Sequence, residues 1–464
     1  MPNEAKILRL SDMIFNRQGT FVRRLIHAVI SLALRLFFRR IETEDASAVP
    51  YKDALIFVMN HPNGLIDPAL VFVALPRKIS FLAKSTLFKM PVVSYVLKVV
   101  EALPVYRKID SADVTKNRLT FEACNDLLRK EGAIALFPEG VSHDSTKLLP
   151  IKTGAARIAL GAISGFSKDE SVKLKIVPVG LYYTNKTTFR SEALLHFGKA
   201  FEVNPVELES DGDLPREAVR ELSNEIEEAL REVTVNAESR AELEVANEAA
   251  NLFLSVSETF DLEESLAARS EFIREYLAEK DNNDEAGLDL EAVTGRISEY
   301  KKKLRQIGLE PENLSLSSQP FWYVFQHFLV RVWLLLLVSP LAIVGVIIHF
   351  PAYQLIKVIG DRYTKHGVDD IVSTVKISAG IVFMPLTWIV IAALIYYFVD
   401  LQAALISLPL SFLCGYAALR TLEELYDMRG WFKAVWLFFR KRDLFVDLLL
   451  ERRALYRSLR KEGS

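Results

Sequence analysis

The first residues that could do chemistry are a histidine and an aspartate, His61 and Asp67, in the sequence NHPNGLIDP. The motif directly follows ALIFVM (54–59), a run typical of a buried strand. The aspartate can accept a hydrogen bond from one imidazole nitrogen, which leaves the other to take a proton from a hydroxyl group. On a helix, residues six apart point roughly 240° away from each other, so the pair needs the turn that Pro62 and Gly64 permit. The pattern resembles two members of a hydrolytic triad, with a substrate alcohol in place of the serine.

A structural explanation of the same residues stays open at this point. Asp67 followed by Pro68 is a favourable beginning for a helix, and this alone would account for the aspartate. The histidine would then have a structural role. Motifs further along the chain decide between the two interpretations.

Other strand-like runs also end in residues that could bind a ligand. Arg107 ends LPVYR, and the planar fork of a guanidinium suits a phosphate, although a surface cation is an alternative. Glu139 can bind hydroxyl groups, and Gly140 lets the backbone approach a ligand, although Pro-Glu-Gly also makes ordinary turns. Lys152 precedes a helix start of small residues and could add a second charge for a phosphate. IVPVGLYY (176–183) supplies the last strand end.

Residues 43–206 alternate short apolar runs with helix-like stretches. The strand-like runs are ALIFVM, KISFLA, ALPVYR, AIALFP and LKIVPVGLYY. This alternation predicts an α/β domain with a mostly parallel central sheet flanked by helices. Such sheets bind ligands at the carboxyl ends of their strands.

The rest of the chain divides by composition into three parts. Residues 1–42 contain FVRRLIHAVISLALRLFFRRI, whose apolar centre is too short to cross a bilayer. We therefore expect a helix that lies at the membrane surface, or one that packs on its own domain. Residues 207–320 are acidic and show helical spacing, which predicts a helical insertion. Residues 321–464 form a hydrophobic membrane region with a basic tail.

Three stretches in this last region contain no Asp, Glu, Lys or Arg: 332–350, 377–399 and 401–419. Each is long enough to cross a bilayer, so we expect an integral membrane protein with transmembrane helices. Asp400 alone joins the last two stretches, which favours a tight hairpin.

The Ser339-Pro340 pair near the middle of the first stretch favours a second hairpin, built from 321–338 and 341–359. Two hairpins would place the basic tail and the catalytic domain on one side, the cytoplasmic face.

Charge and cysteine content exclude several classes of protein. The net charge is −2, but residues 207–310 hold 28 acidic and 12 basic side chains, so the remainder is basic. A basic body with a long apolar tail indicates anionic lipid as a partner and not nucleic acid. The two cysteines, Cys124 and Cys414, imply neither a disulfide framework nor a cysteine-based zinc site.

Four motifs, NHPNGLIDP, LPVYR, FPEGVSHD and IVPVGLYY, occur in the order and approximate spacing of those in glycerolipid acyltransferases. Over about residues 55–200 the chain resembles this family. Five residues separate His61 from Asp67 where the usual family motif has four. This longer spacing, with FPEG-x-SHD and LLPIK-x-G, is similar to the fungal-type glycerol-3-phosphate and dihydroxyacetone-phosphate acyltransferases.

The resemblance implies a role for each motif residue. His61 would be the general base and Asp67 the residue that orients it. The substrate-binding residues that it implies are Arg107 and Lys152 for the phosphate, Glu139 and Gly140 for the acceptor, and Val177 and Pro178 for the acyl side of the pocket.

The expected activity is transfer of a fatty acyl group from a thioester to a hydroxyl of glycerol-3-phosphate or dihydroxyacetone phosphate. The donor would be acyl-coenzyme A or acyl carrier protein, with no bound cofactor and no metal. One alternative is a lysophospholipid acyltransferase that acts on 1-acyl-glycerol-3-phosphate. Another is an inactive lipid-binding or scaffold membrane protein. No protein partner of the acidic region can be named from the sequence.

Overall fold

The computed structural model describes most of the 464 residues: 5–7, 19–50, 52–75, 77–110, 112–165, 172–210, 212–254, 265–283, 290–308, 321–364 and 369–461. The chain forms two compact units. The first contains Met1–Ala237, Ser265–Ser270 and Tyr363–Ile377, and the second contains Glu238–Glu264, Glu271–Arg362 and Ser378–Ser464. Each unit is described by itself.

In the described part of the first unit, nine strands form one sheet in the order β1-β2-β8-β7-β3-β6-β4-β5, with β9 paired to β7. The strands are β1 (Ala5–Ile7), β2 (Arg40–Glu44), β3 (Ala54–Met59), β4 (Ser80–Lys84), β5 (Leu103–Val105), β6 (Ala133–Leu136), β7 (Leu174–Tyr183), β8 (Glu192–Phe197) and β9 (Phe201–Glu202). The central strands β7, β3, β6, β4 and β5 run parallel to one another, and β2 runs parallel to β8. Antiparallel pairs join β7 to β8 and β9, and β1 to β2. The predicted mostly parallel sheet is confirmed.

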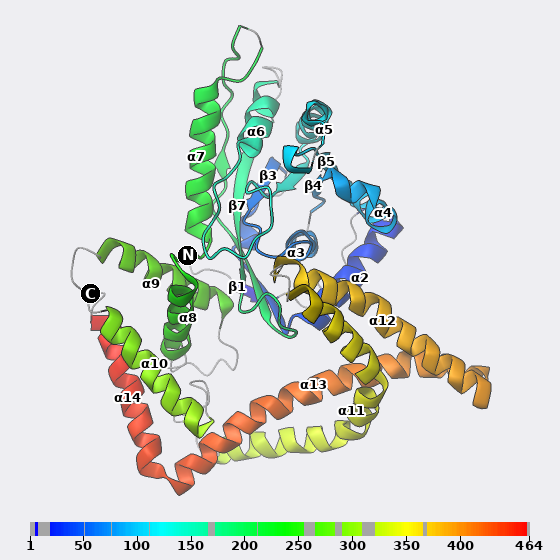
Figure 1. Ribbon diagram of the computed structural model, residues 1–464, viewed down its shortest axis with the longest axis vertical. Helices are drawn as coiled ribbons and strands as arrows, with labels where there is room; N and C mark the ends of the chain where they lie inside the picture. The colour runs from blue at the N-terminus through cyan, green and yellow to red at the C-terminus, as the bar shows by residue number, and fades with distance from the viewer. Residues whose placement is uncertain are drawn as a thin grey trace. The chain divides into compact units, whose positions relative to one another are not determined.

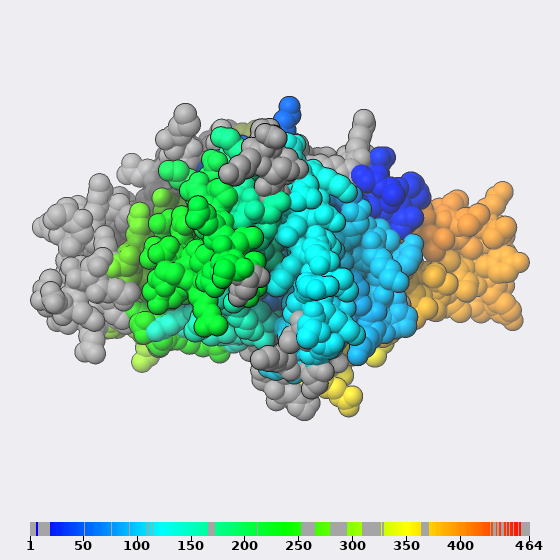
Figure 2. All heavy atoms as spheres, turned by 90° about the horizontal axis from the view of Figure 1, so that it is seen from above, coloured from blue at the N-terminus to red at the C-terminus, as the bar shows by residue number. Residues whose placement is uncertain are grey.

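Helices cover both faces of this sheet because its strands are apolar on both sides. On β3, Leu55, Phe57 and Met59 belong to one core cluster, and the alternate residues belong to the other. The first face carries α2 (Phe21–Phe37), α3 (Ile66–Ala74) and α4 (Pro91–Val99). The second carries α5 (Asn117–Arg129), α6 (Gly154–Ser164) and α7 (Arg216–Val233). Figure 1 shows α7, α6 and α5 following one another across this face, and Figure 2 shows this side from above, with α7 in green and α5 in cyan.

Helix α2 has two different sides. Its buried side consists of Arg23, His27, Ser31, Leu34 and Phe37. The guanidinium of Arg23 donates to the carbonyl of Ile79 over 3.3 Å, and burial lowers its pKa. The opposite side exposes the apolar residues Phe21, Val22, Leu25 and Val29. The helix is thus packed on its domain along one side only, and contact of its exposed stripe with a membrane surface stays a prediction.

The described part of the first unit also contains four short 3₁₀ helices: η1 (Ala46–Ala48), η2 (Ser85–Lys89), η3 (Lys108–Asp110) and η4 (Val114–Lys116). The remaining elements are the helices α8 (Arg240–Leu254), α9 (Leu266–Asn283), α10 (Leu290–Ile307), α11 (Phe321–Thr364), α12 (Asp369–Phe398), α13 (Leu401–Arg440) and α14 (Arg442–Lys461). Within the second unit, α8, α10 and α14 share a small core around Tyr300, whose hydroxyl donates to the carbonyl of Leu448.

Three of the described helices are long and apolar enough to cross a membrane, over Leu329–Arg362, Ile371–Phe398 and Leu401–Tyr426. The turn between α12 and α13 is tight, and the carboxylate of Asp400 accepts the N–H of Ala403 over 2.7 Å to cap α13. The rings of Trp388 and Phe412, twelve residues before and after Asp400, meet edge to face at 5.6 Å. The predicted hairpin of these two helices is present.

The predicted hairpin within 321–359 is wrong, because α11 is one continuous helix through Pro340. A proline inside a helix deprives the carbonyl four residues earlier of its hydrogen bond. Here that carbonyl belongs to Leu336, and the hydroxyl of Ser339 donates to it over 2.9 Å. The serine supplies the missing bond, so the helix continues.

A polar side chain in this apolar region, His349, has both ring nitrogens engaged. The indole N–H of Trp388 donates to Nε2 over 2.8 Å, and Nδ1 lies 2.8 Å from the carbonyl of Gly345. Since Nε2 accepts, Nδ1 carries the proton and donates to that carbonyl. A neutral, fully hydrogen-bonded imidazole is compatible with an apolar segment.

Gly180 on β7 offers a test of the packing between α7 and the sheet. A methyl group at this position would overlap the carbonyl oxygen of Val233 at the end of α7. We expect Gly180→Ala to lower the free energy of unfolding by about 1–3 kcal/mol, because backbone atoms must move. The measurement is the midpoint of thermal unfolding of the detergent-solubilised protein.

Gly161→Ala is the matched control, because the nearest atom to a methyl group there is 4.0 Å away. Gly161 lies inside α6, where alanine is the better helix former, so this midpoint should stay or rise. Equal midpoints for Gly180→Ala and the wild type would contradict the packing.

Candidate active site

The candidate site is built where parallel strands end together. Because β3, β6, β4 and β5 are parallel neighbours, the residues that follow them meet at one edge of the sheet. His61 follows β3, Glu139 and Gly140 follow β6, Lys84 ends β4 and Arg107 follows β5. Strand topology thus gathers residues that are far apart in the sequence.

The His61 and Asp67 side chains are in direct contact. Nδ1 of His61 lies 2.8 Å from Oδ2 of Asp67, which is fully buried in the first turn of α3. The intervening loop turns at Gly64, whose φ is +37°. An ionised carboxylate only accepts hydrogen bonds, so Nδ1 of the histidine donates and Nε2 carries the lone pair. This arrangement prepares Nε2 to act as a base.

Two further donors hold the carboxylate of Asp67. The main-chain N–H of Asn63 donates to Oδ2 over 2.7 Å, and the hydroxyl of Tyr183 donates to Oδ1 over 2.5 Å. Burial raises the pKa of Tyr183 well above its usual range, and the negative charge of Asp67 raises it further. The phenol therefore stays protonated and remains a donor. Three hydrogen bonds offset the cost of burying this charge.

The ring and backbone of His61 are held as well. The imidazole stacks on the ring of Phe137 with centroids 4.0 Å apart and an angle of 16°. Its main-chain N–H donates to Oε1 of Glu139 over 2.8 Å, and its carbonyl accepts the N–H of His143 over 3.1 Å. One residue earlier, the amide of Asn60 exchanges two hydrogen bonds with the backbone of Leu181. These bonds fix the point at which the chain leaves β3.

Glu139 is buried and connects the loops that follow β3 and β6. Besides the N–H of His61, its carboxylate accepts the N–H of Leu149 over 2.9 Å and a hydrogen bond from Nε2 of His143. His143 can donate there because its Nδ1 accepts the N–H of Ser145 over 3.1 Å. In the structure, Glu139 therefore fixes the two loops relative to each other. Its contact with the acceptor, which the resemblance implies, stays a prediction.

Next to Glu139 and Gly140, three positively charged side chains surround the carboxylate of Asp110. The guanidinium of Arg107 donates to both oxygens of Asp110 over 2.7 and 2.9 Å, and also to the carbonyl of Gly140. The hydrogen bond from Arg107 holds the pKa of Asp110 below its usual range, and the charges of Lys84 and Lys152 add to this effect. Since three positive groups face one negative group, the cluster favours a further anion.

Gly140 could not be another residue without rearrangement. Its φ is +76°, which favours glycine, and a methyl group there would overlap the ammonium group of Lys152. The main-chain N–H of Lys152 donates to the carbonyl of Pro138 over 2.8 Å, which holds its segment against the same loop. Arg107, Gly140 and Lys152 are therefore brought together.

Val177 and Pro178 lie inside β7, in register with Phe57 and Val58 of β3. Val177 is fully buried in the core on the α3 side, and the carbonyl of Pro178 accepts the N–H of Gly198. Among the described contacts none joins either residue to His61. Their predicted role beside an acyl chain stays a prediction.

Sequence reasoning missed several residues of the site, above all Tyr183 and Lys84. Strand alternation is a signal for the first, because Tyr183 shares a face with Val179 and Leu181 at the end of β7. The pairing of Lys84 with Val105 follows from the register between β4 and β5, which no motif encodes.

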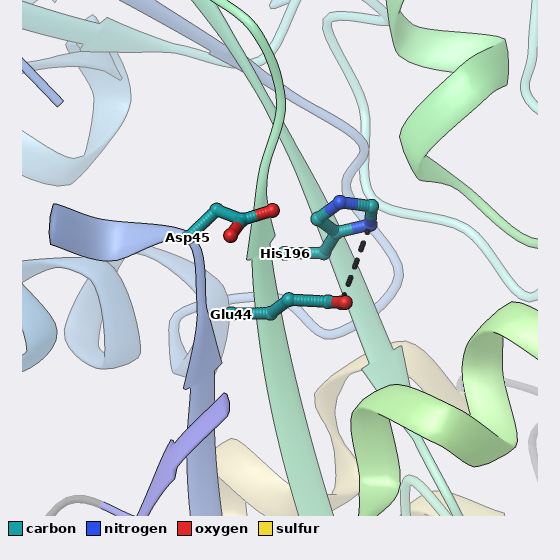
Figure 3. A group of neighbouring side chains, drawn as sticks. All are labelled: Glu44, Asp45 and His196. Atoms are coloured by element: carbon teal, nitrogen blue, oxygen red, sulfur yellow. Dashed lines mark ion pairs between the residues drawn. The ribbon is translucent and has the colours of Figure 1, made fainter. Parts of the chain in front are cut away.

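A second cluster lies on β2 and β8, which β7 separates from β3. Figure 3 shows Glu44 and His196 facing each other, with Nδ1 and Oε2 3.7 Å apart, and Asp45 beside them. The potential ligand atoms of the three residues lie within 4.8 Å of one another. Glu44 and His196 are directly in register, so an ion pair between neighbouring strands accounts for this cluster.

Comparison with known protein families gives two matches. Residues 40–182 match the family described as Acyltransferase, and residues 245–461 match the Glycerol-3-phosphate acyltransferase 2 C-terminal domain. The first match contains His61, Asp67, Arg107, Glu139 and Lys152. The second contains the three apolar helices.

Two Saccharomyces cerevisiae proteins are similar over most of this chain. Glycerol-3-phosphate O-acyltransferase 2 is 29% identical over 310 residues, covering 64% of this chain and 41% of the yeast protein. Glycerol-3-phosphate O-acyltransferase 1 is 31% identical over 290 residues, covering 58% and 36%. This chain therefore spans less than half the length of these relatives. Among solved structures, the 1-acyl-sn-glycerophosphate (LPA) acyltransferase PlsC of Thermotoga maritima matches with a TM-score of 0.32 and 17% identity, over 47% of this chain and 83% of that one.

The hydrogen bond from Tyr183 to Asp67 predicts a measurable loss of stability. In Tyr183→Phe the buried carboxylate loses one of its three donors, which should lower the free energy of unfolding by about 1–3 kcal/mol. The measurement is again the midpoint of thermal unfolding. Tyr95→Phe is the control, because Tyr95 is exposed on α4 and its variant should unfold like the wild type. A wild-type midpoint for Tyr183→Phe would show that this donor is dispensable.

Proposed function

We propose that this protein transfers a fatty acyl group from a thioester to a hydroxyl of glycerol-3-phosphate or dihydroxyacetone phosphate. The matches of residues 40–182 to the Acyltransferase family and of residues 245–461 to the Glycerol-3-phosphate acyltransferase 2 C-terminal domain support this proposal. The observation that carries this proposal is a base beside a cluster of cations. Glu139 contacts His61, and the next residue, Gly140, contacts Arg107 and Lys152. A hydroxyl and a phosphate of one small acceptor can thus be bound together.

The base acts in the step that forms the new ester. Nε2 of His61 takes the proton of the acceptor hydroxyl while that oxygen attacks the thioester carbonyl carbon. The C–O bond forms, the C–S bond breaks, and the sulfur leaves with the proton from the imidazolium as a free thiol. Asp67 stabilises the imidazolium between these transfers, as in a hydrolytic triad. The acceptor itself is the nucleophile, so the step needs no acyl-enzyme.

The cations orient the acceptor. In the structure Asp110 occupies the fork of Arg107, and its lowered pKa keeps it ionised at neutral pH. A phosphate carries more negative charge than this carboxylate and can share or replace it at Arg107, while Lys84 and Lys152 add attraction. When these cations hold the phosphate, the hydroxyl of the same acceptor is placed at His61. The binding energy of the phosphate thus orients the hydroxyl for the reaction.

A membrane location agrees with this chemistry. The fatty acyl donor and the acylated product are amphipathic, and three described helices are long enough to cross a bilayer. We place the catalytic domain on the cytoplasmic face, because the first 40 residues carry eight basic and two acidic side chains, which the anionic lipids of that leaflet attract. The donor is acyl-coenzyme A or acyl carrier protein.

The direct test is acyl transfer by membranes that contain the protein. Glycerol-3-phosphate, dihydroxyacetone phosphate and 1-acyl-glycerol-3-phosphate are offered separately with each acyl donor. His61→Ala should lower the rate by about 10²–10⁴-fold, because the base is lost. His196→Gln is the control histidine, in the cluster on β2 and β8, and should keep wild-type activity. A preference for the 1-acyl acceptor would assign the chain to lysophospholipid acylation, and full activity in His61→Ala would refute the proposed base.

Lys84 tests the phosphate site separately from the base. Lys84→Met should raise KM for the phosphorylated acceptor about tenfold and change kcat less, since one charge–phosphate contact is lost. Lys78→Met is the matched surface control, because Lys78 pairs with the exposed Glu101. A KM equal to that of the wild type would place the phosphate elsewhere.

A further inference from the structure

The first turns of α12 belong to the first unit, which contains the sheet and the candidate active site and is called the catalytic domain below, although the same helix continues as a candidate membrane span. Residues Tyr363–Ile377 cluster with the sheet domain, and the rest of α12 clusters with the second unit. Val372 and Ser373 are fully buried, and Ile377 packs against the core on the α3 side. This segment is thus an integral part of the catalytic domain and lies about 310 residues from the His61 motif in the sequence.

Polar side chains of this segment bind two catalytic-domain loops. Oγ1 of Thr374 accepts the main-chain N–H of Leu65 over 3.2 Å. The hydroxyl of Ser373 donates to the carbonyl of Lys186. The ammonium group of Lys376 donates to the carbonyl of Thr187 over 2.7 Å. Three of four consecutive residues therefore make side-chain hydrogen bonds to backbone atoms of the site region.

These loops are the ones that hold Asp67. Leu65 is the N-cap residue of α3, and its N–H has no partner within the helix, so Thr374 supplies one. The carbonyl of Lys186 also accepts the side-chain amide of Asn63 over 3.4 Å. The main-chain N–H of Asn63 in turn binds the same oxygen of Asp67 that His61 contacts.

The Lys186 loop also reaches the loop that follows β6. The ammonium group of Lys186 lies 2.8 Å from Oδ1 of Asp144 and 3.4 Å from the carbonyl of His143. His143 is the residue whose N–H binds the carbonyl of His61. The loop after β7 therefore contacts both the loop that follows β3 and the loop that follows β6. Ser373 and Lys376 of α12 bind this same loop.

We propose that Ser373 and Thr374 are positioning residues for the His61–Asp67 pair, so that the beginning of a membrane helix completes the catalytic loop. The proposal rests on the acyl-transfer function of His61. Thr374 fixes the first turn of α3, which carries Asp67, and Ser373 fixes the loop that holds Asn63. Neither residue touches the reacting atoms, so their loss should affect the rate of the chemical step more than the binding of substrates.

The test compares kcat and KM of membrane-embedded variants of the full chain. Thr374→Val keeps the shape of the side chain and removes the acceptor, and Thr374→Ser keeps the hydroxyl. We expect the double variant S373A/T374V to lower kcat about tenfold or more, with KM for both substrates within about twofold of the wild type. Thr374→Ser should retain most of the wild-type kcat.

Thr387→Val is the control on the same helix, because the hydroxyl of Thr387 binds only within α12 among the described contacts, at the carbonyl of Phe383. It should leave kcat unchanged. Thermal unfolding midpoints of all variants separate positioning from loss of fold. If the double variant fails to accumulate, the pair Thr374→Val and Thr374→Ser carries the comparison alone.

The outcomes separate this inference from the function on which it rests. An inactive wild type, or an active His61→Ala, would overturn the proposed function. With an active wild type and an inactive His61→Ala, a wild-type kcat in Thr374→Val and in the double variant would overturn the positioning role only. The positioning role would also be overturned if Thr374→Ser lost as much kcat as Thr374→Val. It would likewise be overturned if kcat fell only in variants whose unfolding midpoint fell with it.

Discussion

The site depends on one buried charge, the carboxylate of Asp67. A carboxylate without solvent is costly unless donors surround it, and here His61, Asn63 and Tyr183 all donate. The bond from His61 places the proton on Nδ1 and leaves the lone pair on Nε2, while the bonds from Asn63 and Tyr183 hold the carboxylate in place. Stability and the proposed function are therefore linked, since the donors that make burial of this carboxylate tolerable also hold it against Nδ1 of His61.

The parallel sheet explains why the cluster of Arg107, Lys84 and Lys152 lies near the His61–Asp67 pair. Strands β3 and β6 are neighbours, so Glu139 can brace the backbone of His61 while Gly140 meets Arg107. Two consecutive residues thus connect the part that would take a proton to the part that would hold an anion. This connection favours, as the acceptor of the proposed reaction, a small molecule that carries both a hydroxyl and a phosphate.

The sequence allowed the sheet and much of the site to be predicted, for a definite reason. Parallel strands end at a common edge, so strand-end motifs such as those of His61, Glu139 and Arg107 can be placed together without coordinates. Tyr183 and Lys84 escaped notice because their places follow from strand register. Thr374 could not be found because its contact depends on the return of the chain to Leu65 after some 300 residues. The predicted hairpin in α11 failed at Ser339, whose hydroxyl repairs the helix that Pro340 would interrupt.

The central claim is that the charge of Asp67 makes His61 a base for acyl transfer. Asp67→Asn tests it most directly, because the amide keeps the size of the side chain and removes the charge. The measurement is kcat for acyl transfer to glycerol-3-phosphate, with the unfolding midpoint recorded for the same preparation. The account predicts a fall in kcat of about 10²–10⁴-fold with KM little changed. A folded Asp67→Asn protein with wild-type kcat would contradict it.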